Sequence, residues 1–106
     1  MERVFRHFEE ELDQLKERLL AMGGLAEERV RESVRGLMDR DHAQLDAVLS
    51  GDEPINDLHM EVDDRCFKLL ALQQPMAVDL RAIVAAVKIN SELERVGDLA
   101  VNIAEA

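Results

Sequence analysis

Residues 5–38, FRHFEEELDQLKERLLAMGGLAEERVRESVRGLM, decide the fold of this chain. Apolar residues recur three and four positions apart along this stretch, which is the spacing of one face of an α-helix. The repeating positions are Phe8, Leu12, Leu15, Leu19, Met22, Ala26, Val30, Ser33 or Val34, and Leu37. Gly23 and Gly24 are poor helix formers, but the spacing continues in phase across them. The stretch therefore predicts one long helix over about residues 2–38, with the glycine pair as the place where it could bend.

The following segment predicts a second helix over about residues 42–73, with a break near residues 50–54. Asp39-Arg40-Asp41 supplies the turn and an N-cap before the next apolar face begins. Pro54 lacks a backbone N–H and clashes one turn back, so the helix is expected in two pieces with Asp52 capping the second. The longer piece turns these residues inward: Ile55, Leu58, Val62, Cys66, Leu69 and Leu72.

Gln73-Gln74-Pro75 predicts the second corner, because the residue before a proline is kept out of the helical region. A third helix then follows over about residues 76–105. Short connections between long helices make antiparallel neighbours. The sequence therefore predicts one all-α domain over residues 1–106, built as an antiparallel three-helix bundle.

Composition narrows the classes of function. The chain has 106 residues and a formal net charge of −10, with 23 acidic against 13 Lys and Arg residues. Such acidity opposes a phosphate backbone, so nucleic acid is not an expected partner. Cys66 has no second cysteine to pair with, and neither a signal peptide nor a membrane-spanning apolar run is recognised. We therefore expect a cytoplasmic protein that reaches a membrane only through its partners.

A line of polar residues on the third helix departs from a purely apolar core pattern. Asn90, Glu94, Asp98 and Asn102 follow one another every four residues, in continuation of Ile83 and Val87. Carboxylates four residues apart on a helix are close enough to share a cation, and oxygen ligands suit Mg²⁺, Ca²⁺ or Mn²⁺ and tolerate iron. Zinc is less favoured. The alternative is that Glu94 and Asp98 pair with arginines of a neighbouring helix or lie at an exposed end of the bundle.

Two segments resemble the PhoU family, bacterial regulators of phosphate uptake. Residues 69–81, LLALQQPMAVDLR, are similar to the second corner of that family. Residues 88–105, KINSELERVGDLAVNIAE, are similar to the segment that carries its Glu/Asp-x-x-x-Asp metal motif. Residues on the first helix also match the family: Phe8, Glu11, Leu12, Leu15, Met22 and Gly23. The resemblance covers essentially the whole chain.

The resemblance implies a regulator that binds metal ions and acts at the inner face of the membrane. Family members link the phosphate ABC transporter, with its ATPase, to a sensor histidine kinase and restrain the phosphate-starvation response. By position, Glu94 and Asp98 become metal ligands for Mg, Mn, Fe or Zn, whereas Asn90 and Asn102 rest on helical phase alone. The family has two three-helix repeats and this chain has one, so we expect a homodimer.

Enzymatic classes are less favoured, although two alternatives to a metal-binding regulator stay open. A carboxylate-bridged metalloenzyme would use Glu-x-x-His pairs, and none occurs in this sequence. His7, His42 and His59 are expected at the surface, and Cys66 is expected in the core rather than as a nucleophile. The second alternative is a structural adaptor that works without metal.

Overall fold

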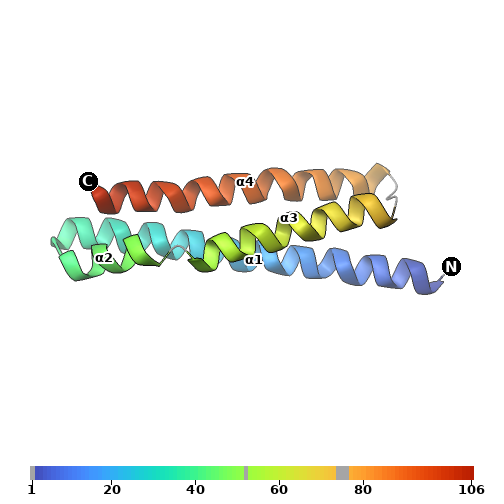
Figure 1. Cartoon of the computed structure of the whole chain (residues 1–106), viewed down its shortest axis with the longest axis horizontal. Helices are drawn as coiled ribbons and strands as arrows, with labels where there is room; N and C mark the ends of the chain where they lie inside the picture. The colour runs from blue at the N-terminus through green and yellow to red at the C-terminus, as the bar shows by residue number, and fades with distance from the viewer. Residues whose placement is uncertain (1, 52, 74–76) are drawn as a thin grey trace.

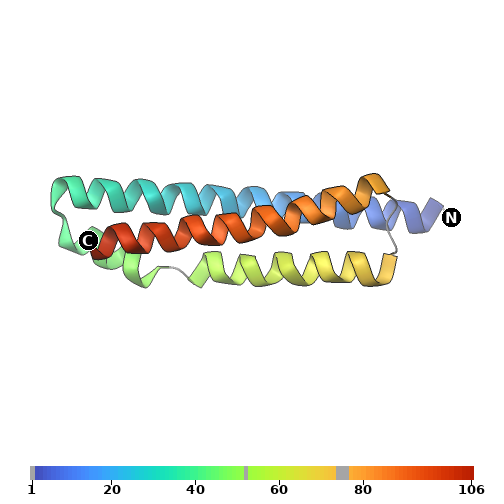
Figure 2. The same ribbon diagram turned by 90° about the horizontal axis from the view of Figure 1, so that it is seen from above.

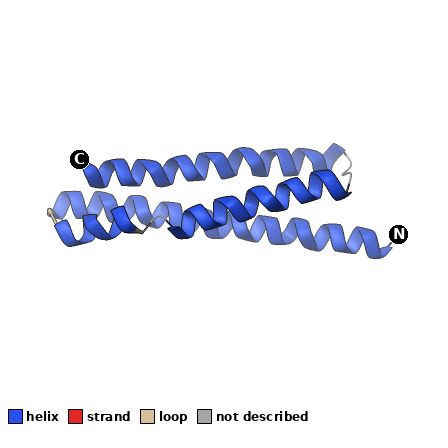
Figure 3. Ribbon diagram, in the orientation of Figure 1, coloured by secondary structure: helices blue, strands red, loops and turns tan. Residues whose placement is uncertain are grey.

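The computed structural model describes the backbone of residues 2–51, 53–73 and 77–106, and the side chains of residues 7–51, 53–71 and 77–106. These residues form four α-helices and no strand (Figure 3). The helices are α1 (Glu2–Asp39), α2 (His42–Ser50), α3 (Glu53–Gln73) and α4 (Ala77–Glu105). Because α2 and α3 follow each other along one limb, the molecule has three limbs (Figure 1). The predicted all-α antiparallel three-helix bundle is confirmed.

The bundle is a rod as long as its first helix. Its extents are 58 × 18 × 16 Å, and α1 has 38 residues, which amounts to about 57 Å at a rise of about 1.5 Å per residue. Helices α1 and α4 run in the same direction, while the α2–α3 limb runs the opposite way (Figure 1). Figure 2 shows α4 lying along both other limbs, with which it is in contact. Within the described residues, no helix combines the length and apolarity needed to cross a membrane.

The core-facing line of α1 departs from the prediction in its last third. Up to Ala26 the expected positions are inward, but beyond it Ser33 and Gly36 are buried, whereas Val34 and Leu37 are 44% and 43% exposed. The buried positions of α1 instead keep the seven-residue spacing of Phe8, Leu15 and Met22, which continues to Arg29 and Gly36. Extending the pattern to Leu37 was therefore wrong, because Leu37 lies one residue beyond this repeat.

The turn between α1 and α2 is closed by its own backbone. Arg40 has a φ of 53°, the left-handed conformation that commonly ends a helix. The Asp41 N–H then donates to the Gly36 carbonyl at 2.9 Å, which satisfies one of the last carbonyls of α1. Asp41 also caps α2, since its side chain accepts from the Gln44 N–H at 3.1 Å. The predicted residues 39–41 therefore form the turn, and Arg40 adopts the strained left-handed conformation within it.

The break between α2 and α3 is held by a buried arginine from α1. Helix α2 ends at Ser50 and α3 begins at Glu53, while the predicted cap Asp52 lies outside the described residues. Arg29 is only 7% exposed, and its guanidinium donates to the Val48 carbonyl at 2.6 Å. A cation is favourable at the C-terminal end of a helix, where carbonyls lack helical partners. The second corner at residues 74–76 and the Leu72 side chain also lie outside the described part.

The buried apolar side chains follow the axis of the rod. The cluster beside the second corner holds Leu15, Cys66 and Ile83, and the cluster at the other end holds Val48 and Ala100. Between them lies a cluster built on Met22, Ala26 and Ile55, against which Leu58, Leu93 and Val96 pack. The polar side chains of α4 lie beside this middle section.

Candidate site between α3 and α4

The four polar residues predicted as one line on α4 spread around the helix. Asn90 is fully buried and Glu94 is half-buried, whereas Asp98 and Asn102 are exposed. Four residues at about 100° each exceed one full turn by about 40°, so each step moves the side chain further from the core. The sequence predicted Asn90, Glu94 and Asp98 on the core-facing side, with Asn102 drifting toward its edge, and this expectation was wrong for Asp98. Of the four, only Asn90 faces the core, and Glu94 lies at the edge of the core.

Asn90 joins α4 to α3 through two hydrogen bonds. Its Nδ2 donates to the His59 backbone carbonyl at 3.0 Å and to Asp63 Oδ1 at 3.2 Å. An amide buried without partners would be unfavourable, so these bonds specify how the two helices align. The Asn90 Oδ1 atom, however, has no hydrogen-bond partner among the described residues.

His59 completes a cluster of polar side chains across the same two helices. Its Nε2 lies 2.8 Å from Glu94 Oε2 and 3.8 Å from Asp63 Oδ2. Only 20% of the His59 side chain is exposed, so its expected placement at the surface was wrong, although His7 and His42 are exposed as expected. Within the described part of the chain, Glu94 pairs with this histidine and not with an arginine, and pairing with arginines was one alternative to metal binding.

We call His59, Asp63, Asn90, Glu94 and Asp98 the α3–α4 seam. Sequence reasoning did not identify His59 and Asp63, because the predicted polar line lies on α4 alone. They repeat on α3 the four-residue spacing of Glu94 and Asp98, and the antiparallel register places His59 opposite Glu94 and Asp63 opposite Asn90. The matching spacing on both sides of the predicted corner was the signal that could have identified them.

The seam contains side chains of the kind that bind metal ions, but they do not form a finished site. Within the described residues, no three His, Cys, Asp or Glu side chains converge closely enough to hold a metal. The imidazole of His59 adds a nitrogen ligand to the predicted oxygen set, which improves the chemical fit for Mn, Fe or Zn. Buried His59 Nδ1 and Asn90 Oδ1 have no hydrogen-bond partner among the described residues. To bind Glu94, a metal ion would have to draw this carboxylate away from His59 or share the carboxylate with the histidine.

A second polar cluster lies between α1 and α3 and is internally balanced. Arg65 contacts Glu61 at 2.8 Å, Gln14 at 3.0 Å and Glu11 at 3.5 Å, and Arg18 also contacts Glu61 at 2.8 Å. Two arginines and two carboxylates neutralise each other there. This cluster is a structural contact between helices.

Cys66 occupies the core, as its position in the apolar pattern predicted. The thiol is 1% exposed, and burial, with a smaller contribution from the Asp63 carboxylate, raises its pKa from 9.0 to about 11. A thiol must ionise to act as a nucleophile. Cys66 therefore stays protonated at neutral pH and contributes packing.

Comparison with known proteins agrees with the architecture. Residues 19–106 match the PhoU domain model. The chain is 44% identical to a phosphate-specific transport system accessory protein PhoU homolog of Caulobacter vibrioides strain NA1000 / CB15N over 102 residues, which is 96% of this chain and 44% of that protein. It is 43% identical to the homolog of Rhizobium meliloti strain 1021, over 96% of this chain and 43% of that protein.

A solved structure shows the same fold. The crystal structure of PhoU from Pseudomonas aeruginosa superposes with a TM-score of 0.89 at 40% identity, over 92% of this chain and 47% of that one. The chain thus spans a little under half the length of the relatives it matches. With a family model covering its last 88 residues, and with the three-limbed bundle of a solved member, this chain belongs to the PhoU family.

Proposed function

We propose that this chain is a non-enzymatic regulator of phosphate uptake and of phosphate-starvation signalling. The observation that carries the proposal is the 44% identity, over 96% of the chain, to a protein named as an accessory of the phosphate-specific transport system. Its partners would be the ATPase of the phosphate ABC transporter and the sensor histidine kinase that the family resemblance implies. The protein would act in the cytoplasm and reach the membrane only through these partners.

A reporter assay in a bacterium lacking its own PhoU tests the regulatory role. Expression of this chain is expected to lower a phosphate-starvation reporter in phosphate-rich medium, and binding of the purified chain to the transporter ATPase or the kinase is expected in a direct titration. The matched control is a variant with an unfolded bundle, Ile83→Asp, since Ile83 is fully buried. An unchanged reporter together with no binding to either partner would refute the proposal.

We also propose that the α3–α4 seam binds a divalent or trivalent metal ion through Glu94 and Asp98, with His59 and Asp63 as ligands from the facing helix. The support is chemical: His59 Nε2 lies 2.8 Å from Glu94 Oε2 and 3.8 Å from Asp63 Oδ2, beside a buried Asn90 oxygen without a hydrogen-bond partner among the described residues, and Asp98 follows Glu94 one turn further along α4. A bound cation would relieve the repulsion among these carboxylates. The predicted ligand Asn102 is exposed one turn beyond Asp98, at the edge of such a site.

Thermal unfolding with a chelator and with Mg²⁺, Mn²⁺, Fe²⁺ or Zn²⁺ tests the metal site. Binding to the folded state alone stabilises by roughly 2.7 kcal/mol at a hundredfold excess over Kd, so the midpoint should rise. Glu94→Ala/Asp98→Ala should abolish the rise. Glu92→Ala should retain it, because Glu92 is exposed on the same helix and contacts Arg95 at 3.6 Å. No rise with any metal would remove this part of the proposal and leave the regulatory part intact.

A metal-independent adaptor is the alternative that the same variants distinguish. The His59–Glu94 contact of 2.8 Å favours it, because the histidine already gives this carboxylate a partner. An adaptor predicts that Glu94→Ala/Asp98→Ala still lowers the starvation reporter. A metal-dependent regulator predicts that it does not. Homodimer formation, which the family resemblance led us to expect, is a further part of the proposal, and light scattering of the purified chain at micromolar concentration tests it.

A further inference from the structure

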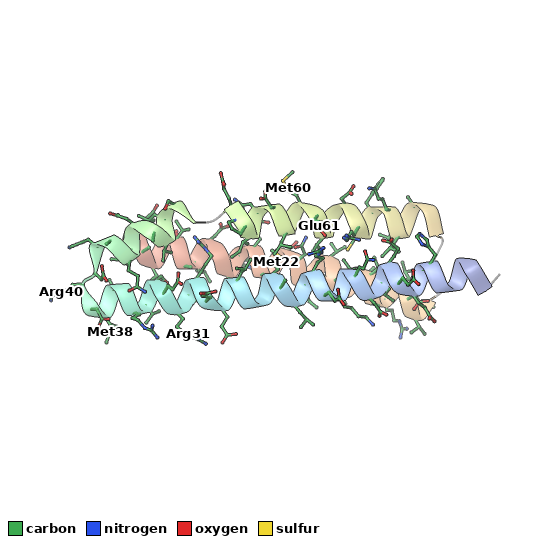
Figure 4. All side chains as sticks on the ribbon, turned by 90° about the horizontal axis from the view of Figure 1, so that it is seen from below. Met22, Arg31, Met38, Arg40, Met60 and Glu61 are labelled. Carbon is green, nitrogen blue, oxygen red and sulfur yellow. The ribbon has the colours of Figure 1, made fainter. Side chains whose placement is uncertain are left out.

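Two lines of side chains border the outer junction of α3 and α4. The α3 line consists of Met60, Asp63, Phe67 and Leu70, and the α4 line consists of Leu80, Val84, Val87, Ser91, Glu94 and Asp98. In both lines the members alternate three and four residues apart, the spacing that keeps side chains on one side of a helix. Figure 4 shows Met60 on the side of α3 that points away from α1. Phe67 follows Met60 by about two turns and therefore shares that side.

Contacts between the two helices place these lines side by side. Glu94 of the α4 line reaches α3 at His59 Nε2, which lies 2.8 Å from the carboxylate. Asp63 of the α3 line accepts a hydrogen bond of 3.2 Å from Asn90 of α4. Val87 packs against the buried cluster to which both helices contribute. The two lines are therefore the two edges of one surface.

The part of this surface beside the second corner is apolar and exposed. Near the end of α3, Phe67 is 69% exposed and Leu70 is 37% exposed. Near the start of α4, Leu80 and Val84 are each 41% exposed. Single apolar side chains are common at protein surfaces, but a group on two neighbouring helices marks an interaction surface, and aromatic residues are enriched in such surfaces. We call Phe67, Leu70, Leu80 and Val84 the corner patch.

The part of this surface further from the corner is acidic. Asp63 lies on one edge and Glu94 and Asp98 lie on the other, and neither line contains Lys or Arg. His59 contacts Asp63 and Glu94 and offsets one of these charges when the imidazole is protonated. The chain as a whole has a net charge of −10. A ligand complementary to this surface therefore has apolar side chains at one end and positive charges at the other.

We infer that this surface binds a cationic amphipathic helix of a partner protein, with apolar side chains on the corner patch and Lys or Arg beside Asp63, Glu94 and Asp98. A helix places its anchors three and four residues apart, which matches the spacing of both lines. An anionic membrane and a second copy of this chain would both bring negative charge to the same carboxylates, so neither fits. The inference rests on the proposed function for the identity of the partners and adds the surface and the segment that meets it.

Fluorescence anisotropy with a labelled helical peptide tests the surface. The peptide is about 18 residues long, the span from Leu80 to Asp98, with Leu anchors in its first half, Lys at the same spacing in its second half, and Ala elsewhere. The full chain is titrated in the presence of a chelator, so that no metal competes at the α3–α4 seam. Wild type should bind this peptide, and should bind a peptide of scrambled order or with Glu in place of Lys roughly tenfold more weakly or not at all. Higher salt should weaken the binding.

Substitution of the exposed ring locates the binding. Phe67→Ser should weaken peptide binding roughly tenfold, with unchanged helicity, because Phe67 is 69% exposed and the bundle does not need it. Met38→Ser is the matched control: Met38 is 78% exposed on α1, on the opposite side from Met60 in Figure 4, and this variant should bind as wild type does. Equal binding of the ordered and scrambled peptides, or equal binding by wild type and Phe67→Ser, overturns the inference.

Two further measurements separate this inference from the proposed function. Light scattering of the same variants shows whether Phe67→Ser turns a dimer into a monomer, which would place a second copy on the patch and overturn the inference. In the reporter assay, Phe67→Ser should fail to lower the starvation reporter while Met38→Ser lowers it. If both variants lower it as wild type does, this surface is wrong and the regulatory role stands. If wild type binds the peptide but leaves the reporter unchanged and binds neither the ATPase nor the kinase, the regulatory role is wrong and this surface stands.

Discussion

Asn90 connects the polar line predicted on α4 with the packing of α4 against α3. It belongs to the polar line on α4, yet it is fully buried and bridges to α3 through the His59 carbonyl and the Asp63 side chain. Buried polar groups of this kind fix helix alignment only when hydrogen-bonded. Its primary role is therefore to set the register of α3 against α4, which brings His59 opposite Glu94.

Replacement of Asn90 should destabilise the bundle. Asn90→Ala removes both interhelical hydrogen bonds, and we expect a loss of about 1–2 kcal/mol in the free energy of unfolding. Asn102→Ala, on the same helix but exposed, should stay within about 0.5 kcal/mol of wild type. Urea denaturation of the two variants measures the difference. Equal stabilities would show that the Asn90 contacts do not hold the helices together.

Cys66 gives the stability a pH dependence. Its pKa is raised by burial to about 11 against 9.0 for a free thiol, so the folded state favours the protonated form. This contribution is complete below pH 9 and is lost as the pH rises toward 11, because only the unfolded state ionises in that interval. The free energy of unfolding of wild type minus that of Cys66→Ala should therefore fall between pH 9 and 11. A constant difference would contradict the burial of the thiol.

At the scale of helices, the end of α1 is fixed by a left-handed residue. Glycine is the usual residue in that position because it has no Cβ to strain, but here it is Arg40, with a φ of 53°. The bond from Asp41 to Gly36 and the Asp41 cap hold the turn despite this strain. The turn is thus specified by the residues around Arg40 more than by Arg40 itself.

Arg40→Gly should stabilise the protein. Relief of the left-handed strain is expected to raise the free energy of unfolding by about 1 kcal/mol. Arg35→Gly is the control, because Arg35 lies inside α1 and is exposed, so the same change should lower stability by about 1 kcal/mol. Thermal or urea unfolding of both variants decides. A destabilised Arg40→Gly would mean that the arginine side chain itself secures the turn.

At the scale of the whole molecule, a thin rod has two unlike long sides. One side carries the carboxylate-rich α3–α4 seam, and another carries an apolar groove between α1 and α4 that is lined by Gly23, Ala26, Val30, Leu93 and Val96. A bundle of three limbs, 18 × 16 Å in section, leaves a large share of its apolar side chains near the surface, since small domains bury less of their surface.

Self-association should therefore appear in the stability of the whole protein. If folded copies associate, the midpoint of thermal unfolding should rise with protein concentration, because association stabilises the folded state by mass action. Calorimetry across the micromolar range provides the measurement. A concentration-independent wild type would indicate that the bundle is stable without a second copy.

By itself, the sequence determined the class of the fold and the family. The three-four spacing of residues 5–38, the proline at residue 54 and the Gln-Gln-Pro corner are local signals, and helix formation and chain reversal depend on local geometry. The buried position of Cys66 followed from the same spacing. These predictions needed no knowledge of which limb contacts which.

Only the tertiary structure decided the composition of the candidate site. A single helix cannot show that Asn90 faces the core while Asp98 does not, because the drift of about 40° per four residues matters only once neighbouring limbs are placed. Likewise, His59 and Glu94 are 35 positions apart in the sequence and meet at 2.8 Å because α3 and α4 are antiparallel and Asn90 fixes their register. The packing of two limbs, which local spacing does not specify, brings His59 and Asp63 of α3 to Asn90 and Glu94 of α4.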